Sequence, residues 1–368
     1  MSGERPDPDL SSQPDTVYVP RNRAERLHKS PAITTSGNVR ELRVPRLRRK
    51  DLEYGNAVEV MDSLVDIARQ AGEEILSSKV VIRDEGTVSG HETSSIDSVA
   101  RNIVDNLLNE KLPHIDGVRR FELHPYERRL LMAAERGTLR GFFIIDEIDG
   151  TTNTKRAMAS PFRYRPQAGV SIAFSPTEQM GDIQTVALYL LNDQETFSAL
   201  RIGDRYQAFH EGRLIRPTEI EATPGDSAQR VLVVGYSNSH RLEKAEIEDV
   251  LVRERGIRPY DGTRSSSVDI INVIRGQYDA YIDLRALWGG DTRTEARLEA
   301  YDVAAAIPIA LGAGLTASDG FGDSWKKYNG MLPLTLVVAR PKLHSKILET
   351  ISPVVARQNG VQVWPQSN

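Results

Sequence analysis

Cysteine is absent from this 368-residue chain, and its absence removes several kinds of chemistry at once. Without thiols there can be no disulfide, no thiolate nucleophile and no Cys-bound zinc or iron–sulfur centre, so oxygen or imidazole must hold any metal ion. Long apolar runs are also missing, since no window approaches the ~20 residues of a membrane-spanning helix. The first residues contain Asp, Arg and Pro instead of an apolar signal core. We therefore expect a cytoplasmic protein without a membrane partner.

The composition is that of an ordinary globular protein. Hydrophobic residues make up 39% and charged residues 27%, with 27 Gly and 19 Pro, which excludes collagen, coiled-coil and wholly disordered classes. At ~100–200 residues per domain, the length allows one large domain or two closely associated ones.

Charge is distributed unevenly along the chain. Residues 1–50 contain 11 Lys or Arg against 6 Asp or Glu, a net +5, so the overall −4 leaves −9 on the remainder. An acidic body argues against nucleic-acid binding and suits a protein that gathers carboxylates around a divalent cation. Residues 1–50 are rich in Pro, Ser and Arg and lack apolar periodicity, which predicts a flexible N-terminal extension. Its basic run at 43–50 is either a tether for an anionic partner or a solvated arm.

Apolar spacing predicts a mixed α/β fold. Apolar residues recur three and four positions apart over 58–76 and 94–111, which indicates two amphipathic helices. Consecutive strand-like runs between 169 and 210 have no intervening helix, which favours antiparallel pairing over a purely parallel sheet. Further strands are expected at 142–145, 231–235, 280–284 and 334–339, and further helices at 245–255, 267–275, 301–311 and 344–351.

The segment Ile144–Asn153 is the most informative part of the sequence. An apolar strand delivers Asp146 and Asp149, and Gly150 then opens a turn toward a helix. Carboxylates this close repel one another unless a cation lies between them, and hard oxygen ligands suit Mg²⁺. The backbone N–H groups of Gly150, Thr151 and Thr152 are placed to hold a phosphate at the helix N-terminus. The alternative is a simple strand-to-helix turn that Asp149 caps.

A second informative feature begins at Asp302, which opens a segment made almost wholly of small and apolar residues, Val303–Leu311. A helix that apolar must be buried, which places Asp302 at the mouth of the core. The alternative is again that Asp302 is an N-cap carboxylate.

Together these features resemble the inositol monophosphatase-like phosphatases, a magnesium-dependent superfamily that includes fructose-1,6-bisphosphatases and phosphoadenosine phosphatases. The family signature Asp-Pro-Ile/Leu-Asp-Gly-Thr/Ser-Thr-Asn is similar to residues 146–153, which differ from it only in having Glu147 for proline. The second signature, Trp-Asp-x-Ala-Ala followed by Ala-Gly-Gly, is similar to 301–305 followed by 312–314. The resemblance extends from about residue 51 to the C-terminus.

The resemblance implies a layered α-β-α-β-α sandwich, usually assembled as a homodimer. Residues 51–368 would form the phosphatase domain, with a metal- and phosphate-binding half at about 51–210 and a substrate-side half at about 211–368. A cofactor of two or three Mg²⁺ ions is implied. In the family a threonine paired with a helix-opening aspartate orients and deprotonates the attacking water, a catalytic role that falls here on Thr151 and Asp97. Asp97 also has the spacing of a capping box with Ser94.

The implied metal ligands are Asp146, Asp149, Asp302 and the carbonyl of Ile148, with one glutamate to complete the set. The family supplies that glutamate, which also has a catalytic role, from a Gly-Glu-Glu roughly twenty residues before the first aspartate. No such motif stands at that distance here. Two residues compete for the role, Glu122, which ends a plausible strand at 118–121, and Glu127, which has the nearer spacing. We favour Glu122.

Substrate contacts are implied at three positions. Asp283 corresponds to the acid with which the family holds substrate hydroxyls. Arg264 and Ser266 stand where the family usually has Gly and Ala, so they either contact a second anionic group or pack. An insertion between Asp283 and Asp302 includes Trp288.

The sequence thus predicts a Mg²⁺-dependent phosphomonoesterase that acts on a small polyol or sugar phosphate. The alternatives are a phosphatase for a bisphosphate, such as fructose 1,6-bisphosphate or a 3′-phosphonucleotide, and a non-catalytic scaffold of the same fold.

Overall fold

The computed structural model describes residues 52–78, 84–88, 91–111, 118–122, 130–134, 142–160, 162, 164–177, 179–217, 229–235, 241–288, 297–330 and 332–358. For 52–56, 84–88, 91–94, 118–122 and 130–134 it describes the backbone alone. The chain divides into two units, Met1–Arg46 and Leu47–Asn368, and every described residue lies in the second. The predicted extension 1–50 lies outside the described residues, so its flexibility stays a prediction.

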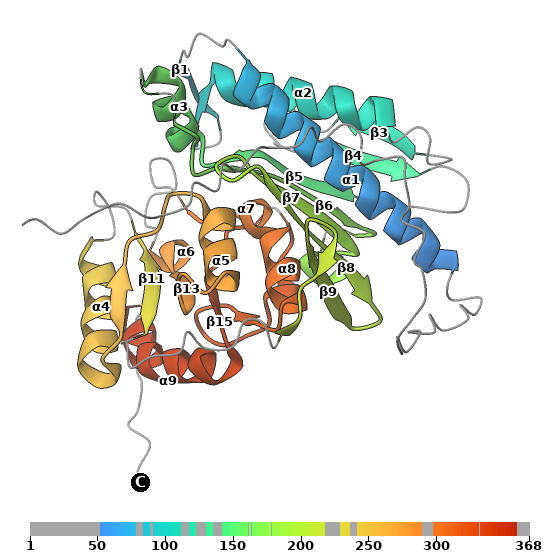
Figure 1. The fold of residues 1–368 in the computed structure, drawn as a ribbon. Coiled ribbons are helices and arrows are strands. Elements are labelled where there is room, and N and C mark those ends of the chain that lie inside the picture. The colour runs from blue at the N-terminus through green and yellow to red at the C-terminus, as the bar shows by residue number, and fades with distance from the viewer. Residues whose placement is uncertain are drawn as a thin grey trace, which may run out of the picture. The chain divides into compact units, whose positions relative to one another are not determined.

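Two amphipathic helices, α1 (Leu52–Ser77) and α2 (Ser95–Lys111), form the first layer. They pack against each other and onto the first large sheet, as Figure 1 shows in blue and cyan. The side chains they bury recur at helical spacing, as in Leu64, Ile67 and Ala71 of α1. Both predicted helices are confirmed.

The first large sheet has six antiparallel strands in the order β10-β9-β8-β7-β6-β5. In chain order they are β5 (Phe142–Asp149), β6 (Gly169–Ser175), β7 (Thr185–Leu190), β8 (Glu195–Ile202), β9 (Arg205–His210) and β10 (Arg213–Leu214). The predicted antiparallel pairing is confirmed. A register shift interrupts the pairing of β5 with β6, where Asp146 lies opposite Ser171 but Asp149 lies opposite Gly169.

Alternate residues of β5 enter different cores because strand side chains alternate between faces. Phe143 and Ile145 pack with α1 and α2, whereas Ile144 belongs to the core on the other face. There the sheet is covered by α5 (Ser266–Ile274), α7 (Ala300–Val303) and α8 (Ala306–Gly312), the middle layer.

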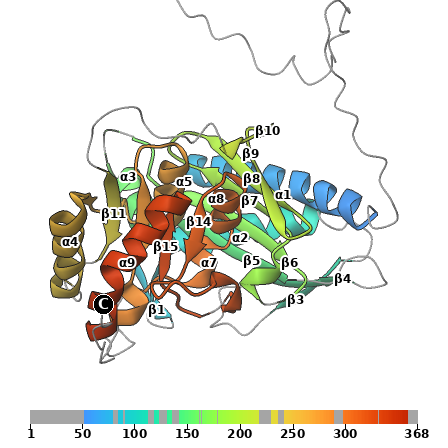
Figure 2. The same ribbon diagram turned by 90° about the horizontal axis from the view of Figure 1, so that it is seen from below.

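The second large sheet has the order β12-β11-β13-β15-β14. Its strands are β11 (Arg230–Val234), β12 (Arg258–Tyr260), β13 (Ala280–Asp283), β14 (Thr316–Ser318) and β15 (Leu336–Ala339). β11 runs parallel to β12 and β13, and the other pairs are antiparallel. The last layer is α4 (Arg241–Arg255) with α9 (Pro341–Gln358), which contacts β14 and β15 (Figure 2). The layers therefore follow the expected α-β-α-β-α order.

Smaller elements complete the described chain. They are β1 (Asp84–Val88) paired with β2 (His91–Ser94), β3 (Val118–Glu122) paired with β4 (Leu130–Ala134), α3 (Thr151–Ala159), α6 (Arg285–Trp288) and the short helical turns Met180–Asp182 and Trp325–Lys327.

The single helix expected over 301–311 is wrong, because the structure has α7 and α8 with a turn at Ala304 and Ala305. Pro308 explains the interruption. It has no N–H to donate to the carbonyl of Ala304, and its ring crowds that carbonyl. The segment is nevertheless as buried as predicted, with Ala304 to Ile307 wholly enclosed.

Candidate active site

Asp149 is the last residue of β5, and the chain turns sharply after it. Gly150 has φ 101°, a left-handed conformation, and a Cβ there would lie 2.7 Å from the carbonyl oxygen of Gln167. Only glycine suits both conditions. Gly150 is also the N-cap of α3, with no side-chain cap. The alternative that Asp149 merely caps this helix is therefore wrong.

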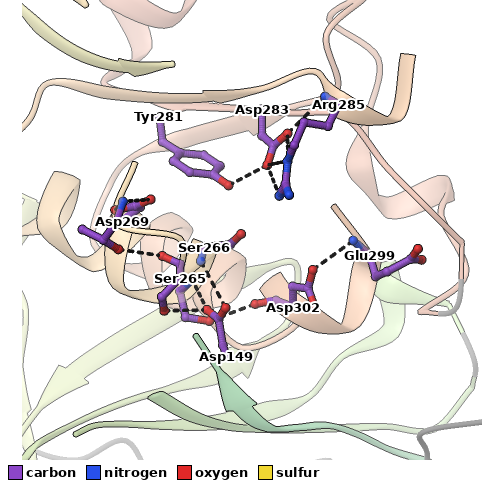
Figure 3. A network of polar contacts seen from close by, with 11 residues as sticks. Asp149, Ser265, Ser266, Asp269, Tyr281, Asp283, Arg285, Glu299 and Asp302 are labelled. Carbon is purple, nitrogen blue, oxygen red and sulfur yellow. Dashed lines mark hydrogen bonds and ion pairs between the residues drawn. The ribbon is translucent and has the colours of Figure 1, made fainter. Parts of the chain in front are cut away.

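The carboxylate of Asp149 is instead held by the start of α5. It accepts hydrogen bonds from the hydroxyl of Ser265 at 2.9 Å and from the backbone N–H groups of Ser266 at 3.2 Å and Ser267 at 2.6 Å. Ser265 is itself the N-cap of α5. These three serines form a cradle around an acid more than a hundred positions away in the sequence, which the sequence analysis missed (Figure 3).

Asp302 lies close to this cradle, on α7. The hydroxyl of Ser267 donates to its backbone carbonyl at 2.8 Å, and its side chain accepts from the N–H of Glu299 at 3.1 Å. Glu299 is the N-cap of α7 and forms a reciprocal capping box with Asp302. Asp302 is thus the third residue of the helix and not its N-cap, contrary to the alternative considered from the sequence.

Burial raises the pKa of both acids. For Asp302 the pKa lies well above its ordinary value, mainly through burial and then through the negative charge of Asp149. Burial also raises the pKa of Asp149, against the lowering effect of its hydrogen bonds from the serine cradle. Because the negative charge of Asp149 disfavours the ionised form of Asp302, a bound cation would stabilise the ionised forms of both neighbouring carboxylates.

The donor atoms here are those that Mg²⁺ prefers, namely carboxylate and carbonyl oxygens. Asp149 and Asp302 are brought together, and Asp146 lies on the same strand as Asp149 and accepts from the N–H of Ile148 at 3.2 Å. Within the described ranges, no three His, Asp or Glu side chains gather closely enough to hold a metal by themselves. The chemistry of the donors therefore fits Mg²⁺, with a coordination set that the described side chains complete only in part.

The two candidates for the missing glutamate fall differently in the structure. Glu122 ends β3, as expected, and its backbone alone is described. Glu127 lies outside the described residues. The choice between them stays a prediction.

Thr151 and Asp97 meet as predicted. The Thr151 hydroxyl lies 2.8 Å from Oδ1 of Asp97 and 3.2 Å from the carbonyl oxygen of Ile148. One helical turn after Asp97, Arg101 forms an ion pair with Glu147 at 3.5 Å. Glu147, which replaces the family's proline, therefore ties α2 to β5 beside the site.

Two further residues fix the loop before the serine cradle. The side-chain amide of Asn153 donates to the carbonyl of Thr263 at 2.7 Å, and the N–H of Thr263 lies 3.0 Å from both carboxylate oxygens of Asp269. Burial raises the pKa of Asp269 to about 7. Asp269 is the one acidic residue of α5, a helix whose side chains are all buried, and an acid within that largely apolar stretch could have drawn attention to it.

The residues expected to contact substrate differ in exposure. Arg264 is exposed and has φ 71°, while Ser266 is buried and uses its N–H on Asp149. Asp283 is fully buried and its two oxygens accept from the guanidinium of Arg285 at 2.6–3.0 Å and from the hydroxyl of Tyr281 at 3.0 Å. A substrate role for Asp283 stays a prediction, and it would require opening this ion pair.

Comparison with known proteins agrees with the geometry. The sequence model of the Inositol monophosphatase family matches residues 56–356. The fructose-1,6-bisphosphatase/inositol-1-monophosphatase of Archaeoglobus fulgidus is 26% identical over 239 residues, which are 61% of this chain and 76% of that protein.

Solved structures share the fold. The extragenic suppressor protein suhB from Bartonella henselae has a TM-score of 0.57 at 20% identity, covering 80% of this chain and 98% of that one. The IMPase of Thermotoga maritima has a TM-score of 0.54 at 18% identity, covering 82% and 99%. In the part of the chain that the structure describes, no helix has the length and apolar character needed to cross a bilayer.

Proposed function

The chain belongs to the inositol monophosphatase family, and on this premise we propose that it is a Mg²⁺-dependent phosphomonoesterase acting on a small polyol or sugar phosphate. Family membership indicates a phosphatase. The substrate and the metal are the proposed part.

The observation that carries this proposal is the 2.8 Å hydrogen bond from Thr151 to Asp97, beside two neighbouring acids, Asp149, which is buried, and Asp302, which is half-buried. A threonine hydroxyl that donates to a carboxylate can accept a hydrogen from water at the same oxygen. A proton of the attacking water would move to the Thr151 oxygen as the hydroxyl proton moves to Asp97. The pair would thus act as a general base without forming a covalent intermediate.

The start of α3 suits the phosphate. Its first N–H groups have no partner inside the helix by geometry, and the positive end of the helix dipole favours an anion. The left-handed turn at Gly150 brings the backbone there without a side chain in the way. Gly150, Thr151 and Thr152 would therefore orient the phosphoryl group against the water that Thr151 holds.

Asp146, Asp149, Asp302, the carbonyl of Ile148 and either Glu122 or Glu127 would hold the Mg²⁺ ions. When bound, the metal would supply charge neutralisation for the phosphoryl oxygens and lower the pKa of the attacking water. The serine cradle would keep the Asp149 carboxylate in one orientation.

The test is phosphate release from a panel of inositol, sugar, nucleotide and amino-alcohol phosphates, with Mg²⁺ and with a chelator, beside an Asp149→Asn variant. We expect turnover that needs Mg²⁺ and that Asp149→Asn loses. Turnover unaffected by chelation would contradict the metal assignment. No turnover, with no Mg²⁺ binding by calorimetry, would favour the non-catalytic scaffold.

We further propose a cytoplasmic homodimer whose partner molecules are small phosphate esters and not nucleic acids. Sedimentation of the full chain would test the oligomer. A monomer at micromolar concentration would contradict it.

A further inference from the structure

Ser171, on β6, is a wholly buried residue whose hydroxyl oxygen has no hydrogen-bond partner among the described residues. Leaving a buried hydroxyl unpaired costs free energy, and the large majority of buried polar groups in folded proteins are paired. The buried serines beside Asp149 follow that rule, since the hydroxyls of Ser265 and Ser267 both donate. The unpaired hydroxyl of Ser171 therefore needs an explanation.

The pairing of β5 with β6 places Ser171 directly opposite Asp146, one of the proposed metal ligands. The two strands lie side by side in Figure 1. Residues opposite each other in an antiparallel pair share one face of the sheet, with Cβ atoms about 4.5–5.5 Å apart. At that separation a serine hydroxyl can reach the carboxylate of an aspartate.

The other nearest neighbours of Ser171 on this face of the described sheet have no polar side-chain atom. Along β6 they are Gly169 and Ala173, because alternate residues of a strand share a face. Across the sheet, on β7, the residue opposite Ser171 is Leu188. Leu188 and Ala173 belong to the buried apolar core. Within this part of the sheet, Asp146 is therefore the neighbour to which the Ser171 hydroxyl can donate.

Asp149 shows how a carboxylate of this site is held in place. It accepts from the hydroxyl of Ser265 and from two backbone N–H groups of the serine cradle. Carboxylates that bind metal ions are generally hydrogen-bonded in this way, because the donors fix their orientation. Asp146 is half-buried and accepts from the N–H of Ile148 at 3.2 Å, the upper end of the usual range. A donor at Ser171 would hold Asp146 as Ser265 holds Asp149.

We propose that Ser171 is a positioning residue of the metal site, whose hydroxyl donates to the carboxylate of Asp146 when Asp146 binds Mg²⁺. The hydrogen bond would restrict rotation of that carboxylate. Hydrogen bonds at catalytic sites are often long or misaligned in the free protein and tighten when a ligand binds. This inference rests on the proposed Mg²⁺-dependent function and assigns a role to a residue that does not itself touch the ion.

Ser171→Ala tests the proposal, because it removes the hydroxyl and little else. The two measurements on the full chain are the Kd for Mg²⁺ by titration calorimetry and the Tm in chelator. We expect the Kd to rise about tenfold or more, as is typical when a residue that orients a metal ligand is lost. The Tm in chelator should stay the same or rise, because alanine removes an unpaired buried hydroxyl. A merely structural hydroxyl would instead lower the Tm in chelator and leave the Kd unchanged.

Thr185 provides a matched control. It is also wholly buried in the same sheet, and its hydroxyl oxygen has no partner among the described residues. On β7 it alternates with Val186 and Leu188, so it lies on the opposite face of the sheet from Ser171, with Ala187. Thr185→Val keeps the shape of the side chain and should leave the Kd for Mg²⁺ unchanged.

Three results would overturn the role of Ser171 while leaving the proposed metal site intact. They are an unchanged Kd in Ser171→Ala, an equal rise of the Kd in Thr185→Val, and a lowered Tm of Ser171→Ala in chelator, which would show that the hydroxyl is paired in the free protein. If the unsubstituted chain takes up no Mg²⁺, the proposed Mg²⁺-dependent function is overturned and this inference with it.

Discussion

The hydroxyl of Thr151 lies 2.8 Å from the carboxylate of Asp97, although the two residues are 54 positions apart and belong to different helices. Asp97 is in the first turn of α2, and Thr151 is the first residue of α3. Helix α2 rests on β5, the strand that leads directly into Gly150 and α3. The sheet therefore fixes the distance between these two groups.

Removing the Thr151 hydroxyl should abolish most turnover. Thr151→Val keeps the shape of the side chain but cannot relay a proton to Asp97, so we expect kcat to fall about 10²- to 10⁴-fold with little change in KM. Thr151→Ser should retain much of the activity. The measurement is steady-state kinetics on the best substrate of the panel. A Thr151→Val enzyme with ordinary kcat would remove Thr151 from the mechanism.

Magnesium should stabilise the folded protein, because it would relieve the repulsion between Asp149 and Asp302. At about a hundredfold excess over Kd, binding to the native state alone contributes about 2.7 kcal/mol. We expect Tm to rise with Mg²⁺ and to return on chelation, and Asp302→Asn to show a smaller rise. Exposed Asp204→Asn serves as the control. If Mg²⁺ does not change the Tm of the unsubstituted protein, the proposed metal site at Asp149 and Asp302 would be contradicted.

Metal-free protein should lose stability as pH rises from about 4 to 7. Burial raises the pKa of Asp269 to about 7, above the ~3.9 of an unfolded chain, so its contribution is complete below the unfolded pKa and disappears as pH passes through the folded one. The raised pKa values of Asp149 and Asp302 act in the same direction. In Asp269→Asn the slope of Tm against pH should be smaller in chelator. An unchanged slope would contradict this role for Asp269.

Breaking the buried pair of Asp283 and Arg285 should be costly. Arg285→Met leaves a carboxylate that is wholly enclosed without its cation, which typically destabilises a protein by about 3–5 kcal/mol. The double variant Asp283→Leu with Arg285→Met should recover most of that loss. Arg357→Gln, which breaks an exposed pair with Glu246, should change stability by about 0–1 kcal/mol. Urea unfolding measures all three, and equal effects for the buried and exposed pairs would contradict the assignment.

The ion pair of Arg101 with Glu147 should contribute to turnover as well as to stability. Because Arg101 lies one helical turn after Asp97, its contact with β5 helps to set the position of that acid. Glu147→Gln should lower the free energy of unfolding by less than about 1 kcal/mol. It should also reduce kcat by a factor of up to about five. If Arg101→Gln lowers kcat by the same factor, and the double variant loses no more than either single variant, the two residues act as one unit. Additive losses would show that the two residues act separately.

The sequence correctly predicted those features of the fold that depend on short stretches of chain. Apolar alternation and short connections were enough to predict the antiparallel strands between 169 and 210. The run from Asp146 to Thr152 was enough to predict a strand, a turn and a helix start in the right order. Family resemblance added the pairing of Thr151 with Asp97, which no local spacing contains.

The features of the site that the sequence did not predict depend on contacts between side chains and segments that come together only in the folded chain. Three consecutive serines at 265–267 look like any helix start, and only the packing of α5 onto the first sheet presents their donors to Asp149. Asp283 was expected to hold substrate hydroxyls, whereas the guanidinium of Arg285, two positions later, donates to both of its carboxylate oxygens. The turn between α7 and α8 is a different case. It could have been predicted, because Pro308 is visible in the sequence and interrupts a helix through local contacts alone.

The register shift in β5 decides which way the site's acids point. Between Asp146 and Asp149 the strand advances three residues while its neighbour advances two, from Ser171 to Gly169. On a regular strand, residues three positions apart have side chains on opposite faces of the sheet. Here the bulge accommodates one extra residue between Asp146 and Asp149, so both acids lie on the same face. Deleting Glu147 or Ile148 would leave the two aspartates two residues apart. If β5 then paired regularly with β6, both acids would still lie on the same face of the sheet, but closer together along the strand. Inserting one residue without enlarging the bulge would send them to opposite sides of the sheet. The length of this segment, counted in whole residues, is therefore as much a part of the site as the carboxylates it carries.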